Sequence, residues 1–573
     1  MQKCTSSCAP PAEVRSGIHA RAGHPNRGPR EQASVVSTYT VAMTFICVSI
    51  FVDAPLDVPH AIARGADSVK QGARMIEWRL DALAEHPEGL PAILELLEKS
   101  PAPCIATIRA EDEGGTWDGD EQTRISILEA MGVSDHPPAY FDLELAAWQR
   151  SANLRQKVRL AVDHAAQVRD ISARLVLSSH DFGGRPANLL SRVADMIETE
   201  PCAVGKIVFT ARSIRDNLEM FDLLAERQKP MIALCMGEFG EMSRILAPKF
   251  GGFLTFAASE TGGATAPGQL TVRQLRERFR FDHIGPSTRV YGVIGHPVAH
   301  SLGPLVHNQG FEAVGVDAVY IPLPVLRGWE SFKASLLELI EHPRLDFSGC
   351  SVTLPHKEHL LRFVQEAGGV VDETARRIGA ANTLAILEDG SLACSNTDAH
   401  AAVESLAHGM GKSTAELHGA RVAIFGAGGV ARAVTCGLLD VGARVVIFNR
   451  TRSRANAIRD DFKVHGDVTV GRDIEDVTAS DFDALINGTS VGMDGGDGAG
   501  DSVLPRSVRL DGSVTVMDTV YAPRMTPLLA KAEAEGARVI DGSAMFIAQA
   551  ESQFKIWTGV AAPAGLFASI LSR

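Results

Sequence analysis

The sequence lacks the features that mark several classes of protein. It has no apolar run long enough to span a bilayer, so we expect no membrane partner. Its nine cysteines are scattered, with no CxxC pair and no metal-ligand spacing, so no metal is expected and a reducing, cytoplasmic compartment is favoured. Acidic residues outnumber basic ones by 69 to 56, and the net charge of -13 argues against nucleic acid as a partner. A small anionic substrate would therefore need a pocket with locally concentrated Arg and Lys.

The chain of 573 residues is too long for one hydrophobic core, so fused domains are expected. Residues 1–42 are rich in Ser, Ala, Pro, Gly and Arg and show no apolar periodicity, which predicts a disordered N-terminal extension. An Arg-rich, acid-poor start is also typical of an organelle transit peptide. We favour a disordered extension, or a start assigned too early with Met43 opening the first strand, over a transit peptide.

Short apolar runs alternate with longer helical stretches over residues 43–283. The strand-like runs are TFICVSIFV, MIEWRLD, CIATIRA, AYFDLEL, ARLVLSSHD, VGKIVFTA, PMIALCMG and FLTFAAS. Eight such repeats over about 240 residues have the length and rhythm of a closed (β/α)8 barrel. An open doubly wound sheet is the alternative, which eight near-even repeats make less favoured.

The second half of the chain has a different organisation. The run HIGPST at residues 283–288 has the turn-forming residues of a linker, and a βα-type segment follows over 288–416. Residues 417–544 contain RVAIFGAGGVARAV, a strand that runs into a glycine turn and an Ala-rich helix, as in a Rossmann-type domain. Residues 545–573 have apolar residues at helical spacing and are expected to pack back across the cleft. The predicted fold class is α/β, with a barrel fused to a two-domain half.

Unusual polar residues of the first half fall at or just beyond the ends of the predicted strands. They are Glu77, Arg79, Arg109, Glu113, His180, Lys206, Arg244, Thr265 and Gln269. The reactive groups of a (β/α)8 barrel gather at the carboxyl ends of its strands, so we expect these side chains at one mouth. Scattered surface charge would not follow strand ends.

Lys206 lies inside the otherwise apolar run VGKIVF. Burial penalises its ammonium form, and a neutral amine is a nucleophile. A lysine that reaches from the barrel rim to solvent is the alternative. His180 favours chemistry, because a neutral imidazole beside an iminium can remove an acidified neighbouring proton. Arg109 and Arg244 could hold a carboxylate in a bidentate manner, or could be salt-bridge partners at the rim.

The motifs of the first half together resemble type I 3-dehydroquinate dehydratase. They are EWR with Asp81, TIR followed by EGG, SSHDF, GKI, the MGxxGxxSR run and TAPGQ. The resemblance implies that Lys206 forms an imine with the substrate ketone, that His180 moves the proton and assists loss of the hydroxyl, and that Glu113 orients His180. It places at substrate-binding positions Glu77, Arg79, Arg109, Arg244, Thr265 and Gln269. Thr265 departs from the Ser of many relatives but keeps the hydroxyl, and no metal is implied.

The run GAGGVA at residues 426–431 follows a strand and opens a helix, so its glycines can turn tightly and bring backbone N–H groups to a pyrophosphate. The next strand ends in NRTRSR, residues 449–454, and not in the acidic residue that accepts a ribose 2′-hydroxyl. Its arginines could bind a 2′-phosphate instead. NADP is therefore favoured over NAD, with a merely solvated charged loop as the alternative.

Lys357 in SVTLPHK and Asp398 in CSNTD lie in the smaller segment, as expected of a proton-transfer pair that faces a nicotinamide. With GHPVAHS, AANTL, NGTSVGM and MFIAQA, these motifs resemble shikimate dehydrogenase over residues 288–573. The resemblance implies that Lys357 and Asp398 are the catalytic pair. Its substrate contacts correspond to Ser301, Thr353, Asn382, Tyr521 and Gln549, and its cofactor positions to Gly426, Gly428, Gly429, Asn449, Arg450, Thr451, Arg454, Thr519 and Gly542.

One departure concerns Gly303, because relatives usually have Ser-x-Ser where this chain has Ser301, Leu302 and Gly303. The missing hydroxyl predicts weak shikimate binding and leaves room for the extra hydroxyl of quinate. Restoring it with Gly303→Ser is expected to lower the KM for shikimate about ten-fold. Quinate dehydrogenase is thus an alternative for the second half, although Thr353 favours shikimate.

The two resemblances predict a bifunctional enzyme of aromatic amino acid biosynthesis. It would dehydrate 3-dehydroquinate to 3-dehydroshikimate through a lysine Schiff base, and then reduce that product to shikimate with NADPH. A catalytically inactive metabolite sensor that keeps both folds is a different class of answer. A sensor has no need of the Lys206 and His180 pair or of the Lys357 and Asp398 pair, so we favour the enzyme.

Overall fold

The structure is a computed structural model that describes residues 43–169, 173–260, 268–495 and 498–572. The N-terminal segment 1–42 and Thr265, about which the sequence makes predictions, lie outside the described residues. No helix in the described part of the chain is long and apolar enough to cross a membrane. The seven cysteines within these ranges are free and buried.

Eight strands form the first sheet, in the order β7-β6-β5-β4-β3-β2-β1-β8. All pairings are parallel, and Phe253 N donates to Met231 O (2.8 Å) where β8 meets β7. The strands are β1 (Phe45–Phe51), β2 (Met75–Arg79), β3 (Cys104–Thr107), β4 (Tyr140–Glu144), β5 (Arg174–Asp181), β6 (Cys202–Thr210), β7 (Met231–Met236) and β8 (Leu254–Ala257). Each corresponds to one of the eight predicted runs. The expected (β/α)8 barrel is confirmed.

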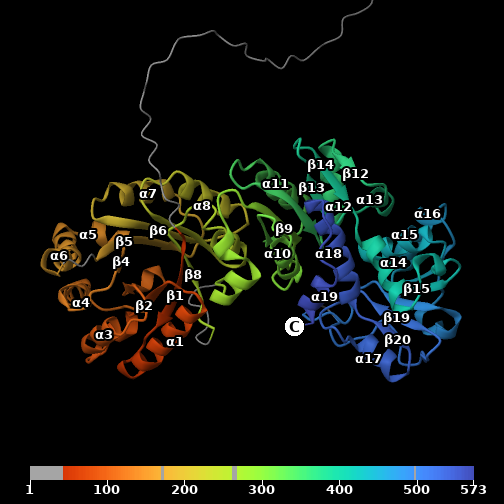
Figure 1. Cartoon of the computed structure of the whole chain (residues 1–573), viewed down its shortest axis with the longest axis horizontal. Coiled ribbons are helices and arrows are strands. Elements are labelled where there is room, and N and C mark those ends of the chain that lie inside the picture. Colours follow the sequence, from red (N-terminus) through yellow and green to blue (C-terminus); the bar gives the residue numbers. More distant parts are fainter. Residues whose placement is uncertain (1–42, 170–172, 261–267, 496–497, 573) are drawn as a thin grey trace, which may run out of the picture. The chain divides into compact units, whose positions relative to one another are not determined.

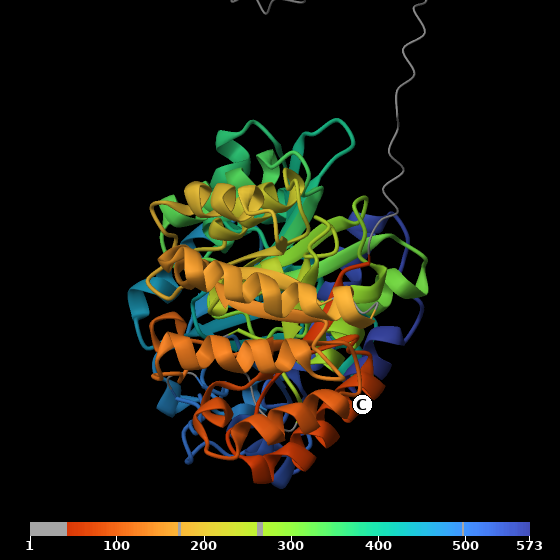
Figure 2. The ribbon, with the colours of Figure 1, turned by 90° about the vertical axis from the view of Figure 1, so that its left-hand side faces the viewer.

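Helices cover the outside of this barrel (Figures 1 and 2). They are α1 (Val58–Gln71), α2 (Asp81–Glu85), α3 (Gly89–Glu98), α4 (Glu121–Val133), α5 (Leu145–Arg150), α6 (Ala152–Arg169), α7 (Leu189–Glu198), α8 (Asp216–Ala225) and α9 (Glu241–Ile245), with a short π-helix at Gln274–Arg278. Strands such as β7, MIALCM, are apolar throughout because both of their faces are buried. Successive side chains of a strand point to opposite faces, so a single polar residue in such a run can face the interior.

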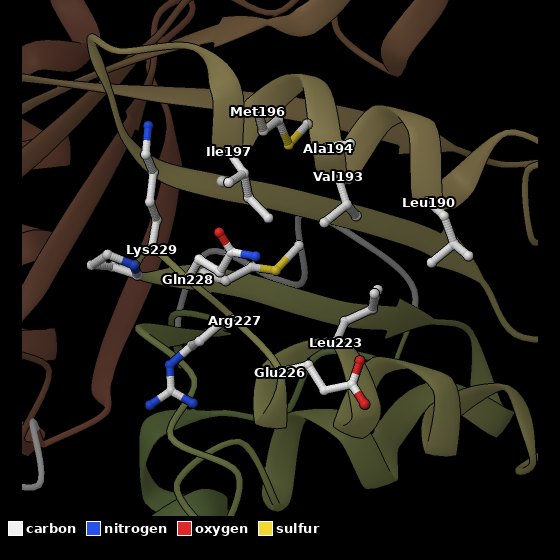
Figure 3. A pocket seen from close by; sticks show the side chains of 13 residues that line it. Leu190, Val193, Ala194, Met196, Ile197, Leu223, Glu226, Arg227, Gln228 and Lys229 are labelled. Carbon is white, nitrogen blue, oxygen red and sulfur yellow. The ribbon is translucent and has the colours of Figure 1, made fainter.

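A crevice on the outer face of the barrel lies between α7 and α8 (Figure 3). Its lining is mostly apolar and includes Val193, Met196 and Gly205. Lys206 follows Gly205 in β6, so its side chain points the opposite way, into the barrel. The crevice is therefore on the helix side of β6, away from the strand ends where the candidate residues gather.

A second sheet follows the linker, in the order β10-β9-β11-β13-β14-β12. It contains β9 (Arg289–Gly295), β10 (Ala318–Pro324), β11 (Phe347–Val352), β12 (Val370–Val371), β13 (Thr383–Ile386) and β14 (Leu392–Ser395). Its helices are α10 (Gly303–Ala313), α11 (Trp329–Glu341), α12 (Lys357–Glu366), α13 (Glu373–Ile378) and α14 (Asp398–Gly409). Strands β9, β10 and β11 are mutually parallel, whereas β13 runs antiparallel to β11 and β14. This sheet carries Lys357 and Asp398 at the starts of α12 and α14.

The third sheet is fully parallel, in the order β17-β16-β15-β18-β19-β20. It contains β15 (Arg421–Phe425), β16 (Arg444–Phe448), β17 (Val468–Val470), β18 (Ala484–Asn487), β19 (Thr515–Asp518) and β20 (Arg538–Ile540), with α15 (Gly429–Asp440), α16 (Arg452–Phe462) and α17 (Pro527–Ala534). The strand order reverses beside β15, and such a switch point is where doubly wound sheets bind dinucleotides. The expected Rossmann-type domain is confirmed.

The chain ends in α18 (Gly542–Thr558) and α19 (Leu566–Leu571). These helices pack on the second sheet and α10, as Phe554 stacks on Phe311 and Trp557 Nε1 donates to Leu384 O (2.9 Å). The terminal segment thus returns to the second sheet, and this return brings Gln549 beside Asn382, which directly precedes β13.

Candidate active sites

Lys206 lies among polar side chains inside the barrel and is 4% exposed. Its Nζ donates to Asp142 Oδ2 (2.9 Å) and Glu77 Oε1 (3.2 Å). The sequence-based expectation considered burial alone, whereas the fold also places two carboxylates within ion-pair distance of this amine. Nucleophilic attack therefore requires a proton to leave Nζ, and Asp142 and Glu77 are within hydrogen-bond distance to accept it.

The two carboxylates beside Lys206 are ionised at neutral pH. Burial raises the pKa of Glu77, but the charge of Lys206 helps to lower it below its ordinary value. Burial also opposes ionisation of Asp142, yet Arg109 and Lys206 hold its pKa well below the usual range. A positively charged imine nitrogen formed at Lys206 would therefore face negative charge.

Arg109 and Arg244, both proposed from the sequence to bind a carboxylate, have different surroundings. Nη1 of Arg109 donates to Ser178 Oγ (2.7 Å) and Glu144 (3.1 Å), and Nη2 donates to Asp142 (2.7 Å). Arg109 is thus a salt-bridge partner, which is the alternative that the sequence left open. Arg244 is 2% exposed and has no hydrogen-bond or ion-pair partner among the described residues.

Burial of Arg244 lowers its pKa to about 10. Burying a guanidinium group without an anion costs free energy, and a carboxylate that pairs with the group reduces this cost. Of the two arginines, Arg244 is therefore the one available to the carboxylate of a substrate.

His180 and Glu113 form a pair at the barrel mouth. Nδ1 of His180 lies 3.0 Å from Glu113 Oε2, which also accepts from the backbone N–H of His180 (2.9 Å). Burial lowers the pKa of His180 well below its ordinary value, so the imidazole is neutral, and burial raises the pKa of Glu113 to about 7. An ionised Glu113 accepts the proton of Nδ1, which leaves Nε2 as a base.

The remaining residues predicted in the barrel differ in their contacts and burial. Arg79 Nη2 donates to Asp81 Oδ2 (2.6 Å), so it is engaged within the protein. Gln269 is half-buried. The sequence did not single out Asp142, although an acidic residue inside the apolar run AYFDLEL was a signal that could have found it.

The second group of predicted residues surrounds Lys357. Its Nζ donates to Asp398 Oδ2 (2.5 Å), and both side chains are largely buried. Asn382 Nδ2 donates to Asp398 Oδ1 (2.9 Å) and Gln549 Oε1 (3.3 Å). Four predicted residues, from α12, α14, the start of β13 and α18, are thus joined by hydrogen bonds.

The other predicted substrate contacts lie on nearby elements. Ser301 Oγ accepts from Gly303 N (3.2 Å) at the start of α10, and Thr353 N donates to Ile294 O (2.9 Å) at the end of β9. Tyr521 packs on Phe546 of α18, and burial raises the pKa of its hydroxyl. Within the described part of the chain, none of these three residues forms a hydrogen bond to the Lys357 group.

Tyr320 is a polar residue of this region that the sequence did not indicate. Its hydroxyl donates to Ser351 Oγ (2.7 Å), and Ser351 Oγ donates to Gln553 Oε1 (2.8 Å). Gln553 in turn donates to Thr383 (3.0 Å). No local sequence motif predicts this series of hydrogen bonds, because its residues come from β10, β11, β13 and α18.

The predicted cofactor residues gather at the carboxyl ends of β15, β16 and β19. Gly426 has a φ of +117°, and a Cβ there would meet Thr489, so this turn requires glycine. A Cβ on Gly428 or Gly429 would meet nothing within 4 Å, so the space before α15 is open. Thr519 Oγ1 donates to Asn487 O (2.9 Å), and Gly542 packs on Val520 O.

The segment after β16 presents arginines to solvent. The guanidinium groups of Arg450 and Arg454 have no hydrogen bond or ion pair to any described residue, whereas Arg452 donates to Gly471 O (3.1 Å). Asn449 Nδ2 donates to Thr451 O (2.8 Å), which shapes the turn. Two arginines are therefore free to bind an anion beside β16.

Comparisons with known proteins agree with the fold of the two halves. Residues 46–286 match the family described as type I 3-dehydroquinase, and residues 293–384 the shikimate dehydrogenase substrate binding domain. Residues 409–492 match shikimate / quinate 5-dehydrogenase, and 542–568 the shikimate 5′-dehydrogenase C-terminal domain. A chloroplastic bifunctional 3-dehydroquinate dehydratase/shikimate dehydrogenase from Arabidopsis thaliana is 34% identical over 543 residues, which cover 92% of this chain and 84% of the relative.

The chain belongs to the bifunctional 3-dehydroquinate dehydratase/shikimate dehydrogenase family.

Other similar proteins cover one half or both. An NADP(+) shikimate dehydrogenase from Methanocella arvoryzae is 40% identical over 280 residues, 48% of this chain and 94% of the relative. A solved structure of dehydroquinate dehydratase and shikimate dehydrogenase from S. pombe AroM has a TM-score of 0.39 and 22% identity, covering 92% of this chain and 98% of that one. Lys206 lies within the residues that match type I 3-dehydroquinase, and Lys357 lies within those that match the shikimate dehydrogenase substrate binding domain.

The space beside Gly303 in the dehydrogenase half is not open, contrary to expectation. A Cβ at Gly303 would lie 3.0 Å from Cε1 of Tyr320, 3.2 Å from its hydroxyl oxygen and 3.3 Å from Ser301 Oγ. The ring of Tyr320 thus occupies the room that the sequence left for an added serine side chain or for the extra hydroxyl of quinate.

Gly303→Ser is therefore expected to raise the KM for shikimate several-fold, reversing the expectation from sequence. The new side chain must displace Tyr320 or Ser301, and overpacking of this kind costs about 1–3 kcal/mol. Steady-state kinetics with shikimate and NADP+ measure the change. Gly303→Ala is the matched variant and should give a similar rise, since the cause is steric. A lower KM in Gly303→Ser alone would restore the hydroxyl explanation.

Proposed function

We propose that this chain dehydrates 3-dehydroquinate to 3-dehydroshikimate in its barrel and reduces that product to shikimate, with NADPH, in its second half. One observation carries the proposal: a single chain of the bifunctional family holds both a buried lysine between two carboxylates, Lys206, and a buried lysine–carboxylate pair, Lys357 and Asp398. Each pair suits one of the two reactions, and the first reaction makes the substrate of the second.

In the dehydratase half, Lys206 Nζ gives up a proton to Asp142 or Glu77 and attacks the substrate ketone. Loss of water then leaves an iminium. Nε2 of His180 removes the proton from the neighbouring carbon, and the electron pair of that C–H bond forms an enamine. The enamine expels the hydroxyl from the next carbon, and protonated His180 returns its proton so that water leaves. Hydrolysis of the imine releases the product and restores the lysine.

Other barrel residues orient this reaction in the proposal. Glu113 holds the tautomer of His180 by accepting from Nδ1, and Arg244 pairs with the substrate carboxylate. Arg109 keeps Asp142 ionised. The substrate-binding positions that the resemblance implied remain proposals: Glu77, Arg79, Arg109, Arg244, Thr265 and Gln269. Among the three arginines, Arg244 would contact the substrate carboxylate, and Arg79 and Arg109 would act through their ion pairs within the protein.

In the dehydrogenase half, bound NADPH supplies the hydride. Lys357 donates a proton to the carbonyl oxygen as charge develops there, and Asp398, at 2.5 Å, holds the ammonium group in place for the transfer. Asn382 keeps Asp398 in place through its own hydrogen bond to Oδ1. The proposed substrate contacts are Ser301, Thr353, Asn382, Tyr521 and Gln549.

The residues present fit NADP. Gly428 and Gly429 leave space where the backbone N–H groups of α15 can approach a pyrophosphate, and that helix begins with its positive dipole end there. Arg450 and Arg454 are free to clamp a 2′-phosphate. We propose as cofactor contacts Gly426, Gly428, Gly429, Asn449, Arg450, Thr451, Arg454, Thr519 and Gly542.

Replacing Arg450 and Arg454 together with Ala is expected to raise the KM for NADP+ by about ten-fold or more while the KM for NAD+ changes little. Each charge-assisted hydrogen bond to the phosphate contributes roughly 1.5–3 kcal/mol, and NAD+ has no phosphate at that position. Arg472→Ala is a control, because Arg472 is an exposed arginine on the neighbouring loop. Equal losses for the two cofactors would reject this assignment.

The domain limits remain proposals: a barrel over 43–283, a substrate domain over 288–416, an NADP-binding domain over 417–544 and returning helices over 545–573. The three sheets support these limits. A cytoplasmic location is also proposed, supported by the free cysteines of the described residues. The Arabidopsis relative is described as chloroplastic, so fractionation of the source cells is the test.

A coupled assay tests the whole proposal. Purified full-length chain receives 3-dehydroquinate and NADPH together, and NADPH consumption is followed by absorbance. Oxidation of NADPH requires both reactions in series, so a signal with 3-dehydroquinate supports the proposal. A chain that oxidises NADPH with added 3-dehydroshikimate but not with 3-dehydroquinate would lack the first activity.

A further inference from the structure

One arginine of the barrel half contacts a proposed substrate-binding residue of the dehydrogenase half. Arg278 ends the short π-helix at Gln274–Arg278, and its Nη2 donates to Ser301 O (2.8 Å) and more weakly to Ala299 O (3.4 Å). Both carbonyls belong to the loop between β9 and α10. This loop carries the Ser301 hydroxyl, so a barrel side chain fixes the backbone on which that hydroxyl depends.

Arg278 is itself fixed by the dehydrogenase half. Its carbonyl oxygen accepts from Nδ2 of Asn308 (2.8 Å), a fully buried residue of α10. Asn308 also binds the backbone of Tyr320 on β10, as donor to its O (2.8 Å) and acceptor from its N (2.7 Å). Backbone and side chain of Arg278 are therefore both held, and the guanidinium has little freedom to leave Ser301.

The same loop touches the barrel at a second place. The ring of His296 stacks on Phe239 with 6.2 Å between ring centres, and His296 Nε2 lies 3.5 Å from Glu238 Oε1. Glu238 and Phe239 belong to the turn between β7 and α9, and α9 carries Arg244. The barrel thus holds the loop at both of its ends.

A half-buried acid interacts electrostatically with Arg278 and with Arg244. Glu241, at the start of α9, is influenced by Arg278 and by Arg244, and burial raises its pKa to about 7 against the effect of both charges. The charge of Glu241 thus acts on Arg278, whereas the side-chain hydrogen bonds of Arg278 go to backbone carbonyls of the dehydrogenase half.

Another contact between the halves does not reach a proposed substrate-binding residue. Lys249, whose side chain is fully buried, donates to Pro286 O (2.8 Å), Thr288 O (2.9 Å) and Asp346 (2.6 Å). These acceptors belong to the linker and to the start of β11, and none is a proposed substrate contact. Lys249 joins the halves, whereas Arg278 reaches a residue of the proposed site.

We propose that Arg278, a residue of the barrel half, is a positioning residue for the dehydrogenase, because it holds the Ser301 loop in the geometry that binds the substrate carboxylate. Oγ of Ser301 accepts from Gly303 N, which leaves its hydroxyl hydrogen to be donated to an anion. The inference rests on the proposed role of Ser301. It makes the dehydrogenase half dependent on the barrel for its substrate affinity.

The test is Arg278→Met in the full chain, which keeps the apolar stem and removes both hydrogen bonds. The expected result is a KM for shikimate raised about five- to ten-fold, or about 1–1.4 kcal/mol, with kcat and the KM for NADP+ within about two-fold, because only part of the effect of the lost hydrogen bonds reaches the hydroxyl. Arg273→Met, at an exposed arginine just before the same π-helix, is the matched control and should change nothing.

Arg278→Lys keeps the charge and one donor and should restore most of the affinity for shikimate. If Arg278→Met does not fold, as shown by its melting temperature, Arg278→Lys still tests the idea through a selective rise of about two-fold in the KM for shikimate. The positioning role would be overturned if the KM for shikimate and the KM for NADP+ rose together, or if only kcat fell.

A double-mutant cycle with Ser301→Ala separates the inference from the proposed function. Arg278→Met should add little once the Ser301 hydroxyl is gone. An unchanged KM for shikimate in Ser301→Ala would refute the role of Ser301 itself. If Ser301→Ala raises the KM for shikimate, the role of Ser301 stands. The role of Arg278 is then overturned if Arg278→Met has no effect, or if its effect on this KM simply adds to that of Ser301→Ala.

Discussion

Lys206→Ala is expected to lower the rate of 3-dehydroquinate dehydration by about 10⁴-fold or more, while oxidation of shikimate by NADP+ stays within about two-fold of the unmodified chain. Removal of a covalent nucleophile eliminates the imine route, and the other members of such a group cannot act without it. The dehydrogenase reaction uses none of these residues. Separate assays of the two reactions on one preparation measure the contrast.

Lys206→Ala is also expected to lower the stability of the fold, so a second variant at this position is needed. Loss of the ammonium group leaves Asp142 and Glu77 with less positive charge nearby, and breaking a buried ion pair costs about 3–5 kcal/mol. Lys206→Arg keeps the charge but cannot form an imine, so it should be equally inactive and more stable. Lys70→Ala, on the surface of α1, is the control with normal activity.

Borohydride identifies the reacting atom directly. Added during turnover, it should reduce the imine and leave an adduct on the peptide that contains Lys206, which mass spectrometry of a digest detects. The Lys206→Arg chain should give no adduct. Label on another lysine would reject the assignment of Lys206, and loss of both activities in a folded Lys206→Arg chain would reject two independent sites.

Lys357→Ala is expected to have the reverse effect, with kcat for shikimate oxidation lowered about 10²- to 10⁴-fold and dehydration nearly unchanged. A positioned acid or base contributes rate factors of this order. Asp398 would lose its ion-pair partner, yet it keeps the hydrogen bond from Asn382 at 2.9 Å, so the site should remain folded. Initial rates with saturating shikimate and NADP+ report kcat without the effect of binding.

Asp398→Asn provides a near-isosteric second variant, because it keeps the shape beside Lys357 and removes the charge. It should lower kcat as well, by less than Lys357→Ala if the lysine is the group that transfers the proton. Lys333→Ala, whose lysine pairs with Glu366 on the surface, is the control. If Lys357→Ala changed only the KM for shikimate, Lys357 would be a binding residue and not the proton donor.

Several parts of the fold could be predicted because they depend on local sequence. All eight barrel strands were found as apolar runs, since a strand buried on both faces is apolar almost throughout. The turn at Gly426 was found because a positive φ requires glycine there. Lys206, His180, Lys357 and Asp398 stood out as polar residues within or after such runs, and this signal is also local.

The partners of those residues could not be predicted. Asp142 and Glu77 are 64 and 129 residues from Lys206 in the chain, and only closure of the barrel brings them to its amine. The sequence considered burial alone and missed the ion pairs. Arg109 and Arg244 looked alike from their strand-end positions, yet three acceptors surround one and none surrounds the other among the described residues.

The sequence by itself determined the order of the barrel and the Rossmann-type half, most of their strands and the residues proposed for the chemistry, because periodicity and turn chemistry act over a few residues. Tertiary structure decided which of these residues are paired, as with Arg109, which space is filled, as with Tyr320 beside Gly303, and which half holds a loop of the other, as with Arg278 and Ser301. Distances between side chains depend on strand register and on how separate elements pack, and residues far apart in the chain set both.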